Sequence, residues 1–223
     1  MPDSSADKST LTLEAIISTA IRLADEHGLE KLSMRRLAGE LGVQAMSLYH
    51  HIPGRDALLD GMVDSVFAEI ELPAADEPWL PAMRRRAESA RAALLRHRWA
   101  VSLMDSRAQP GPATLRHHEA VLGNLRRGGF SVAGAAKAFS LLDAYVYGFV
   151  LQEAALPFNT PAEAEQMAQQ LRAVLSDSHP NLTEMLVMHV LDGEYAYARE
   201  FHGGLDLILD SLRRDAASRE EPA

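Results

Sequence analysis

The chain has 223 residues, close to half of them apolar, and it contains no cysteine. This composition excludes an intrinsically disordered chain, disulfide bonds, thiolate metal ligands and a cysteine nucleophile, and it fits a reducing cytoplasm. The formal net charge of −9 argues against a protein that is covered by nucleic acid over its whole surface.

The first residues, MPDSSADKST, do not place a basic segment before an apolar one, so we expect no signal peptide. The sequence also contains no run of about 18 apolar residues, so we expect no membrane-spanning helix. These two features predict a cytoplasmic protein without a membrane partner.

The charge is distributed unevenly along the chain. From Lys31 to Arg55 the cations include Arg35 and Arg36, the only anion is Glu40, and the net charge of this window is +3. A basic segment within an acidic chain predicts a small nucleic-acid reader joined to an acidic body.

Helical periodicity dominates the sequence and strand signals are almost absent, so we expect an all-α fold. The first expected helix has an apolar stripe from Leu13 to Ala24, with Thr12 as its N-cap and Gly28 at its end. Two short helices, near 34–41 and 44–50, follow on either side of Gly42.

Pro53-Gly54 ends the second short helix, and a longer helix runs to about Ile70. The first candidate domain boundary is the proline-rich segment from Pro73 to Pro81. Beyond it we expect helices near 79–97, 102–108, 112–127, 132–155, 181–191 and 195–214, with Asp192-Gly193 between the last two. The segment 157–180 is polar, and we expect a mobile loop that contains a short helix.

These elements predict a three-helix helix-turn-helix domain joined to a larger α-helical domain. The expected parts are a disordered tail 1–9, a helix-turn-helix DNA-binding domain 10–54, a connecting helix 55–72, a larger helical domain 73–215, and a disordered tail 216–223.

Two short helices joined by a tight corner that contains glycine are typical of a helix-turn-helix. In this motif the second helix presents its first turns to base edges in the major groove. Here Leu48 and Ile52 point back to the core, which leaves small or polar residues exposed on the second helix: Gln44, Ala45, Ser47, Tyr49 and His51.

His50 and His51 have three alternative interpretations. A metal site is the weakest of them, because adjacent side chains on a helix point about 100° apart. For His50, contact with DNA and a solvated helix end both stay open. We assign His51 to DNA.

Three segments resemble the N-terminal domain of the tetracycline-repressor (TetR) family of transcription regulators. They are AxxLxxxxGLEKLSMRRLAGELGV from Ala20, the following SLYHHI, and RDALLD from Arg55. The similarity continues in ALLRHRWAVSLMDSR from Ala93, in LRRGGFS at 125–131 and in FHGGLDLILDSL at 201–212. These later segments are similar to the tetracycline-repressor branch of the family.

The resemblance implies a double-stranded DNA operator as partner. Arg35 matches a base-reading or phosphate-reading arginine, and Ala45 and Met46 replace a Gln-Pro pair that contacts bases, so the operator sequence must differ from that of the tetracycline repressor. The implied DNA-binding residues are Ser33, Met34, Arg35, Gln44, Ala45, Met46, Ser47, Tyr49, His50, His51 and Arg55.

The resemblance also implies a homodimer and a small-molecule effector, with 73–215 as the effector-binding and dimerisation domain. It implies no catalytic residues, no metal ligands and no cofactor. The expected effector contacts are Phe67, Arg86, Ala90, Met104, His118, Val121, Phe139, Leu142 and Asp143. The expected dimer contacts lie on the helices near 132–155 and 195–214 and are Val146, Phe149, Leu205, Ile208, Leu209 and Leu212. Apolar residues on more than one face of both helices agree with such a four-helix interface.

Departures from the branch argue against magnesium-tetracycline as the effector. Its pocket asparagine and phenylalanine fall on Arg86 and Ala90, and its metal-binding histidine falls on Leu103, Met104 or Asp105. These two residues predict a different effector, either acidic, because Arg86 can pair with an anion, or bulkier, because Ala90 leaves room.

Several of these residues have alternative interpretations. Asp143 is either a pocket acceptor or the partner of an arginine, and Met104 is more often a core residue. His117-His118 lacks convincing metal-ligand spacing.

The family implies a repressor that an effector releases through a movement of the helix 55–70, while an activator or co-repressor mode stays open. Two alternatives come from other functional classes. One is an all-α enzyme that uses Arg86, His118 and Asp143, and the other is a helical adaptor that binds only protein. The sequence does not identify the effector, the operator or the regulated genes.

Overall fold

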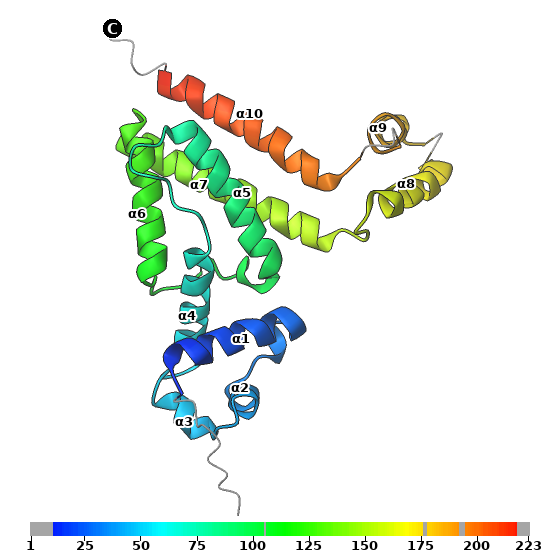
Figure 1. Cartoon of the computed structure of the whole chain (residues 1–223). Helices are drawn as coiled ribbons and strands as arrows, with labels where there is room; N and C mark the ends of the chain where they lie inside the picture. Colours follow the sequence, from blue (N-terminus) through cyan, green and yellow to red (C-terminus); the bar gives the residue numbers. More distant parts are fainter. Residues whose placement is uncertain (1–10, 105, 176–177, 192–194, 218–223) are drawn as a thin grey trace, which may run out of the picture. The chain divides into compact units, whose positions relative to one another are not determined.

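The computed structural model describes residues 11–104, 106–175, 178–191 and 195–217 (Figure 1). All regular elements within these ranges are helices, which confirms the predicted all-α class. None of the helices in this part of the chain has both the length and the apolar composition that crossing a bilayer requires. The predicted tail 1–9, Asp192-Gly193 and most of the predicted tail 216–223 lie outside the described residues.

The chain divides into two compact units, Met1–Leu125 and Arg126–Ala223. The first contains six α-helices within its described residues, together with two short 3₁₀ turns, Leu29–Lys31 and Arg98–Ala100. The α-helices are α1 (Leu13–His27), α2 (Met34–Glu40), α3 (Ala45–Tyr49), α4 (Arg55–Ala68), α5 (Trp79–Arg96) and α6 (Pro112–Arg127).

Local signals set the ends of the N-terminal helices as predicted. Thr12 caps α1 by accepting a hydrogen bond from the backbone N of Ala15, and Ser33 caps α2 in the same way from Arg36. Gly28 and Gly42 follow α1 and α2 with φ angles of 85° and 67°. Only glycine adopts such values without strain, so these two positions turn the chain where each helix ends.

The core of the first unit lies under α1, α4 and α5. Ile16 and Ala20 of α1, Met62 and Val66 of α4, and Ala87 of α5 are completely buried. This packing fixes α1 against α4 and so supports the two short helices that follow α1 along the chain.

The predicted helix at 102–108 is wrong for the described residues in that range. After the 3₁₀ turn Arg98–Ala100 the chain continues in turns to Met104, and residues 106–109 form only a turn and bends. Arg107 donates hydrogen bonds to the Asp60 carboxylate (2.5 Å) and to the backbone carbonyl of Asp56 (3.1 Å) on α4. These tertiary bonds hold the chain against α4, and Pro110-Gly111 further disfavours a continuous helix.

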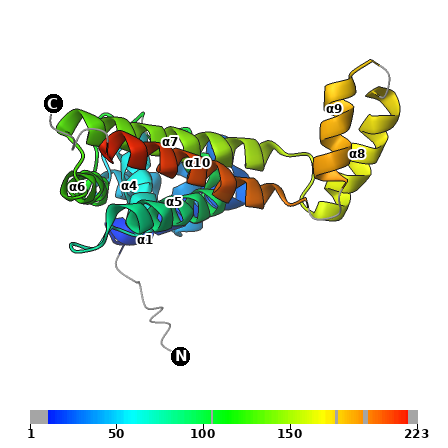
Figure 2. The same ribbon diagram turned by 90° about the horizontal axis from the view of Figure 1, so that it is seen from above.

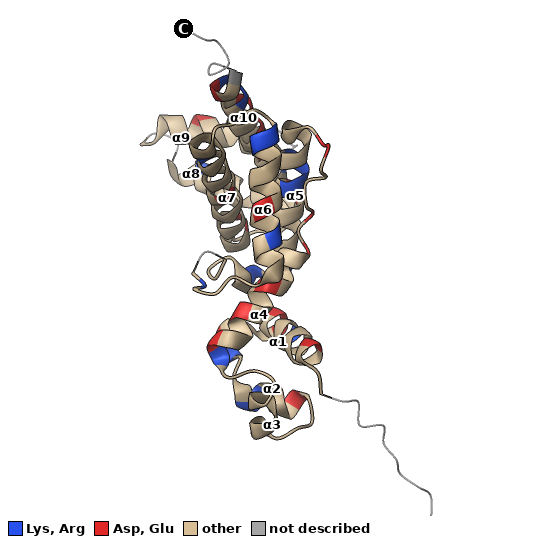
Figure 3. Ribbon diagram, turned by 90° about the vertical axis from the view of Figure 1, so that its left-hand side faces the viewer, with Lys and Arg blue, Asp and Glu red and all other residues tan. Residues whose placement is uncertain are grey.

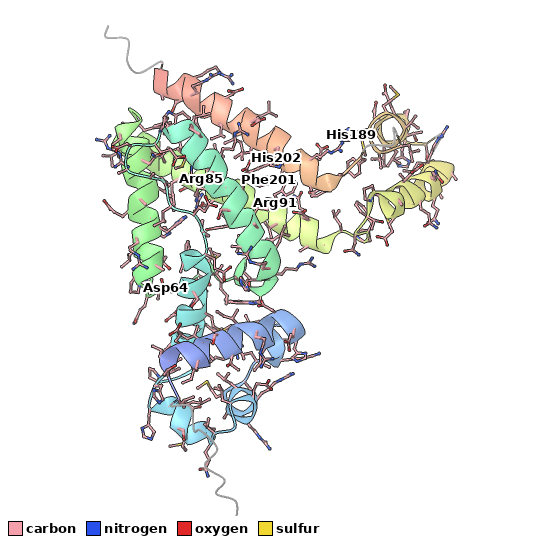
Figure 4. All side chains as sticks on the ribbon, in the orientation of Figure 1. Asp64, Arg85, Arg91, His189, Phe201 and His202 are labelled. Carbon is pink, nitrogen blue, oxygen red and sulfur yellow. The ribbon has the colours of Figure 1, made fainter. Side chains whose placement is uncertain are left out.

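The second unit is built on two long helices, α7 (Val132–Ala155) and α10 (Tyr197–Ala217), which run side by side in opposite directions (Figures 1 and 2). Phe201 of α10, labelled in Figure 4, stacks on Tyr145 of α7 with ring centroids 5.5 Å apart. The Tyr145 hydroxyl donates a hydrogen bond to the Phe201 carbonyl (2.9 Å) and lies against Gly204, where a Cβ atom would be 2.3 Å from the hydroxyl oxygen. Gly204 therefore permits the close approach of the two helices.

The segment 157–180 is helical over most of its length, so the prediction of a loop with a short helix is wrong. It contains α8 (Pro161–Leu175), which packs beside α9 (Pro180–Met185) and the single π-helical turn Leu186–Val190 (Figure 2). The Glu163 carboxylate accepts hydrogen bonds from the backbone N of Asn159 and Thr160, and Thr160 Oγ1 accepts one from the Glu163 backbone N. This reciprocal pattern is a capping box, a sequence signal for a helix start.

Candidate DNA-reading and effector sites

The helices α2 and α3 form a helix-turn-helix. The connection between them closes with a hydrogen bond from the Val43 backbone N to the Ala38 carbonyl (3.0 Å). Leu37 of α2 and Leu48 of α3 are completely buried, and Ile52 is 3% exposed, as predicted. Burial of these three residues fixes one face of α3 to the core and leaves the opposite face to solvent.

The predicted DNA-binding residues all reach the surface of this motif. Met46 and Tyr49 are large apolar side chains, yet they are 69% and 45% exposed. Such exposure on a helix of five residues is typical of a contact surface rather than of a core. Exposed residues of the predicted set are Ser33, Arg35, Gln44, Met46, Tyr49, His50, His51 and Arg55, and half-exposed ones are Met34, Ala45 and Ser47.

The positive charge of the motif lies on α2, because α3 carries no charged residue (Figure 3). Arg35 is exposed, and no ion pair of this side chain is recorded in the described part of the chain. Glu40, the anion of this region, is neutralised by Arg22 of α1 at 2.5 Å. The hydrogen bonds that Arg22 donates to Glu40 and to Glu26 raise the pKa of its guanidinium. The motif therefore presents a net positive surface.

Arg55 has a structural contact within the first unit. Its guanidinium donates hydrogen bonds to the backbone carbonyls of Leu32 and, at 3.1 Å, Leu29. These bonds tie the start of α4 to the connection between α1 and α2. A DNA contact of Arg55 stays a prediction.

Four residues of the first unit form a buried polar and aromatic cluster, which we call the Arg86 cluster: Phe67 of α4, Arg86 of α5, and His117 and His118 of α6. Arg86 is 1% exposed, and its Nε donates a hydrogen bond to Nε2 of His117 (3.1 Å), which is completely buried. The Phe67 ring centroid lies 5.2 Å from that of His117 and 5.5 Å from that of His118.

His117 is neutral at physiological pH. Burial, reinforced by the positive charge of Arg86 and by His118, lowers its pKa from 6.5 to about 3. An arginine N–H only donates, so Nε2 is the acceptor and the ring proton lies on Nδ1. This buried Nδ1–H has no hydrogen-bond partner among the described residues. The cluster therefore offers a donor for an acceptor oxygen.

A small cavity of about 180 Å³ adjoins the cluster. His118 lines it together with Met104, and both belong to the predicted effector set. Its polar lining includes Asp60 of α4, Arg107 and Gln109 of the loop before α6, and Thr114 of α6.

The remaining predicted effector residues are distributed between the two units. Ala90 and Val121 are buried in the first unit. In the second unit Leu142 is completely buried, Phe139 is half-buried, and Asp143, 5% exposed, accepts a long hydrogen bond from Tyr147 (3.4 Å). Effector contacts by these residues stay predictions.

Most of the predicted dimer residues pack inside the protomer. Val146, Phe149, Leu205, Leu209 and Leu212 are all buried in a single chain, and Ile208 is half-exposed. The exposed large apolar residues described on α7 and α10 are Val132 (72%), Leu141 (42%), Leu151 (53%) and Leu207 (75%). None of them is among the predicted dimer contacts, because periodicity alone does not tell which apolar face of a two-faced helix meets its own chain.

The predicted effector contacts include His118 but not His117. Both lie on α6, but only His117 is fully buried and bonded to Arg86. Their positions one residue apart gave no signal for choosing between them.

In the described part of the chain, no three His, Asp or Glu side chains gather into a set that could hold a metal ion.

Two family models match the chain. "Bacterial regulatory proteins, tetR family" matches residues 16–62, and "Tetracyclin repressor-like, C-terminal domain" matches residues 72–215. The chain is similar to the HTH-type transcriptional repressor DrrR1 of Streptomyces coeruleorubidus, with 40% identity over 63% of this chain and 53% of that protein. It is also similar to the class C tetracycline repressor protein of Escherichia coli, with 30% identity over 92% of this chain and 91% of that protein.

Among solved structures, apo ActR from Streptomyces coelicolor superimposes with a TM-score of 0.79 at 32% identity and covers 94% of this chain and 98% of that chain. ActR in complex with actinorhodin gives a TM-score of 0.76 at 33% identity over 92% of this chain and 98% of that one. Both the reading motif and the larger helical domain are therefore matched, and the chain belongs to the TetR family of transcriptional regulators.

Proposed function

We propose that this protein is a repressor that binds a palindromic operator as a homodimer and is released by an organic effector other than magnesium-tetracycline. The observation that carries the proposal is the combination of an exposed, positively charged helix-turn-helix with the buried Arg86 cluster in the same unit. The helix-turn-helix reads DNA, and the Arg86 cluster contributes to effector recognition.

Operator recognition rests on the exposed face of α3. Gln44 is suited to hydrogen-bond an adenine edge, and Met46 offers only apolar contact, for instance to a thymine methyl group. Tyr49, His50 and His51 line the end of the helix and contact the sugar-phosphate backbone, which sets the orientation of the protein.

A homodimer is supported by the unfilled apolar face of α7 and α10. Leu141, Ala144, Gly148 and Leu151 follow each other at intervals of three or four residues, so they lie on one stripe of α7. Leu207 is the most exposed apolar residue described on α10. Two copies related by a two-fold axis would cover both faces and place two α3 helices roughly 34 Å apart, as a palindrome requires.

The effector class follows from the Arg86 cluster. Neutral His117 presents a buried N–H, and Phe67 and His118 add aromatic surface. A planar organic molecule with acceptor oxygens suits this combination. The relative ActR has been solved with actinorhodin and with (S)-DNPA, which makes these two compounds reasonable first probes.

Magnesium-tetracycline does not suit these residues. The position of the metal-binding histidine in the tetracycline-repressor branch falls on Leu103, Met104 or Asp105 here. Met104, for one, is 95% buried and offers no ligand for Mg²⁺.

Release by the effector requires that its binding energy differs between two conformations of the dimer. Helix α4 connects the effector cluster to the helix-turn-helix, because it carries Phe67 at one end and follows α3 at the other. A movement of α4 would change the separation of the two α3 helices and lower operator affinity.

The test is a mobility-shift titration of the purified protein with the intergenic DNA next to its own gene, at two salt concentrations. We expect a complex of one dimer per site that survives excess nonspecific DNA and dissociates with actinorhodin but not with magnesium-tetracycline. Tighter binding in the presence of the effector would instead identify a co-repressor mode. Binding that disappears at modest salt would contradict operator recognition.

A further inference from the structure

His97 lies between two carboxylates that come from different helices. It follows α5 directly, and only 8% of its surface is exposed. Its Nδ1 is 2.9 Å from Oδ1 of Asp25 on α1, and its Nε2 is 3.0 Å from Oε1 of Glu69, the residue that ends α4.

Because each ring nitrogen faces a carboxylate oxygen, the protonated ring donates a hydrogen bond on both sides. A neutral ring has a single N–H, so one nitrogen lone pair would then face a carboxylate. The hydrogen bonds between His97 and the two carboxylates are therefore stronger when the ring is charged than when it is neutral.

Two further side chains hold the carboxylates in place. Trp99 donates its indole N–H to Oδ1 of Asp25 (2.7 Å), and Arg96 of α5 donates to Oε2 of Glu69 (2.6 Å). Partial burial opposes the charged form of Glu69, but Arg96 and His97 outweigh it and lower the pKa of this carboxyl. The charged groups recorded around His97 are thus Asp25 from α1, Glu69 from α4 and Arg96 from its own helix, and we call this set with Trp99 the His97 clamp.

The clamp joins the support of the helix-turn-helix to the rest of the first unit. Helix α1 packs against both α2 and α4, and its last turn contains Asp25. Bonds from His97 and Trp99 to Asp25 fix this turn to the segment that follows α5. The orientation of α2 and α3 therefore depends on contacts that the clamp makes at the C-terminal end of α1.

An open cleft of about 570 Å³ adjoins the clamp. Asp25, Arg96 and Trp99 of the clamp line it, together with Gly28 after α1 and Glu30 of the turn Leu29–Lys31. Proton exchange at the clamp therefore requires no unfolding of the domain.

We propose that His97 is a positioning residue for operator binding, and that its positive charge holds α1 in the orientation in which α3 reads DNA. The proposal rests on the proposed operator-binding function. Loss of the proton loosens α1, so operator affinity falls as the pH rises and His97 becomes neutral.

The experiment compares operator affinity at pH 6.0 and 8.0 in the Trp79→Phe background, which leaves Trp99 as the only tryptophan of the chain. We expect affinity to fall by roughly fivefold over this range, which is at the lower end of ordinary coupling between two sites. His97→Gln should lose this fall, because an amide does not change charge. The matched control is His27→Gln, on the exposed last turn of α1, which should keep the dependence of the parent.

The histidines His50 and His51 also lie exposed at the end of α3. The decisive quantity is therefore the difference between the pH profiles of His97→Gln and of the parent. If operator affinity changes with pH to the same extent in His97→Gln and in the parent, the proposal is overturned. If His97→Gln does not fold, Glu69→Gln removes one of the two carboxylates and should reduce the pH dependence; an unchanged dependence overturns the proposal as well.

Trp99 fluorescence without DNA separates this proposal from the proposed function. We expect the emission of Trp99 to change between pH 6.0 and 8.0 in the parent and to stay constant in His97→Gln. A parent that shows the fluorescence change but binds no operator at any pH contradicts operator binding and leaves the clamp intact. A parent that binds its operator with no Trp99 response overturns the clamp.

Discussion

Asp64 of α4, labelled in Figure 4, caps the first turn of α6. Its Oδ1 accepts hydrogen bonds from the backbone N (2.8 Å) and from Oγ1 (2.9 Å) of Thr114, and its Oδ2 accepts one from the backbone N of Ala113 (3.2 Å). An N-cap normally comes from the residue before the helix, but here a different helix supplies it. The cap therefore links α4, which leads from the helix-turn-helix, directly to the helix that carries His117.

Replacement of this cap should lower stability and weaken the response to the effector. Asp64→Asn removes the negative charge at the N-terminus of α6 and places an amide N–H₂ opposite N–H donors. We expect the free energy of unfolding to fall by about 1–2 kcal/mol, as for other lost N-caps. We also expect more effector to be needed for operator release. Denaturant unfolding and the mobility-shift titration measure the two effects.

Gly111→Ala tests the same contact from the other side. A Cβ atom at this position would lie 2.3–2.6 Å from the carboxylate of Asp64, so the carboxylate must move away from α6. We expect a loss of about 1–2 kcal/mol in unfolding free energy, similar to that of Asp64→Asn. Gly39→Ala is the matched control, because no atom lies within 4 Å of its Cβ position and alanine favours helix α2. Equal stability of Gly111→Ala and the parent would contradict the close contact.

Arg35→Ala should weaken operator binding. If the guanidinium reads a base, the loss is roughly 1–3 kcal/mol and specificity at one base pair relaxes; if it contacts a phosphate, binding weakens on all sequences and the salt dependence decreases. Arg116→Ala, which removes the same charge from an exposed site on α6, serves as control. Unchanged operator affinity in Arg35→Ala would refute the assignment of this residue to DNA binding.

Leu207→Arg should prevent dimerisation. The substitution places a charge on the most exposed apolar residue of α10, where the proposed interface would bury it without a partner. We expect sedimentation velocity to show a monomer that is folded by circular dichroism and has lost specific operator binding. Leu115→Arg changes a similarly exposed leucine (54%) on α6 and should remain dimeric. A dimeric Leu207→Arg protein would place the interface elsewhere.

His117 should make the protein sensitive to acid. Its pKa of about 3 in the folded chain lies below the unfolded value of 6.5, so the unfolded chain binds a proton first as the pH falls. The folded state therefore loses stability below pH 6.5, by about 2 kcal/mol between pH 7 and 5 from this residue alone. His117→Gln keeps an acceptor for Arg86 without a titrating group. Its unfolding free energy should decrease less over this interval than that of the parent, and an identical decrease would argue that His117 is accessible to protons when folded.

Much of the N-terminal domain was predictable because its signals are local. Thr12, Ser33, Gly28 and Gly42 act on their own turn of backbone, and the helices α1 to α3 begin and end within one or two residues of the predicted positions. Burial of Leu48 and Ile52 followed from the periodicity of a single short helix. The same locality applies to the capping box of Thr160 and Glu163, which marks the start of α8 within a segment that was predicted as a loop.

Tertiary structure alone decided the features that join distant parts of the chain. The turn around Arg107 is set by its bonds to α4, 47 residues away, which override the local helical pattern. Nothing in the spacing of His117 and His118 shows which ring meets Arg86, since that depends on how α5 and α6 pack. Likewise His97 gains its two carboxylates from α1 and α4 only after folding, because contacts between residues far apart in sequence depend on packing rather than on local propensity.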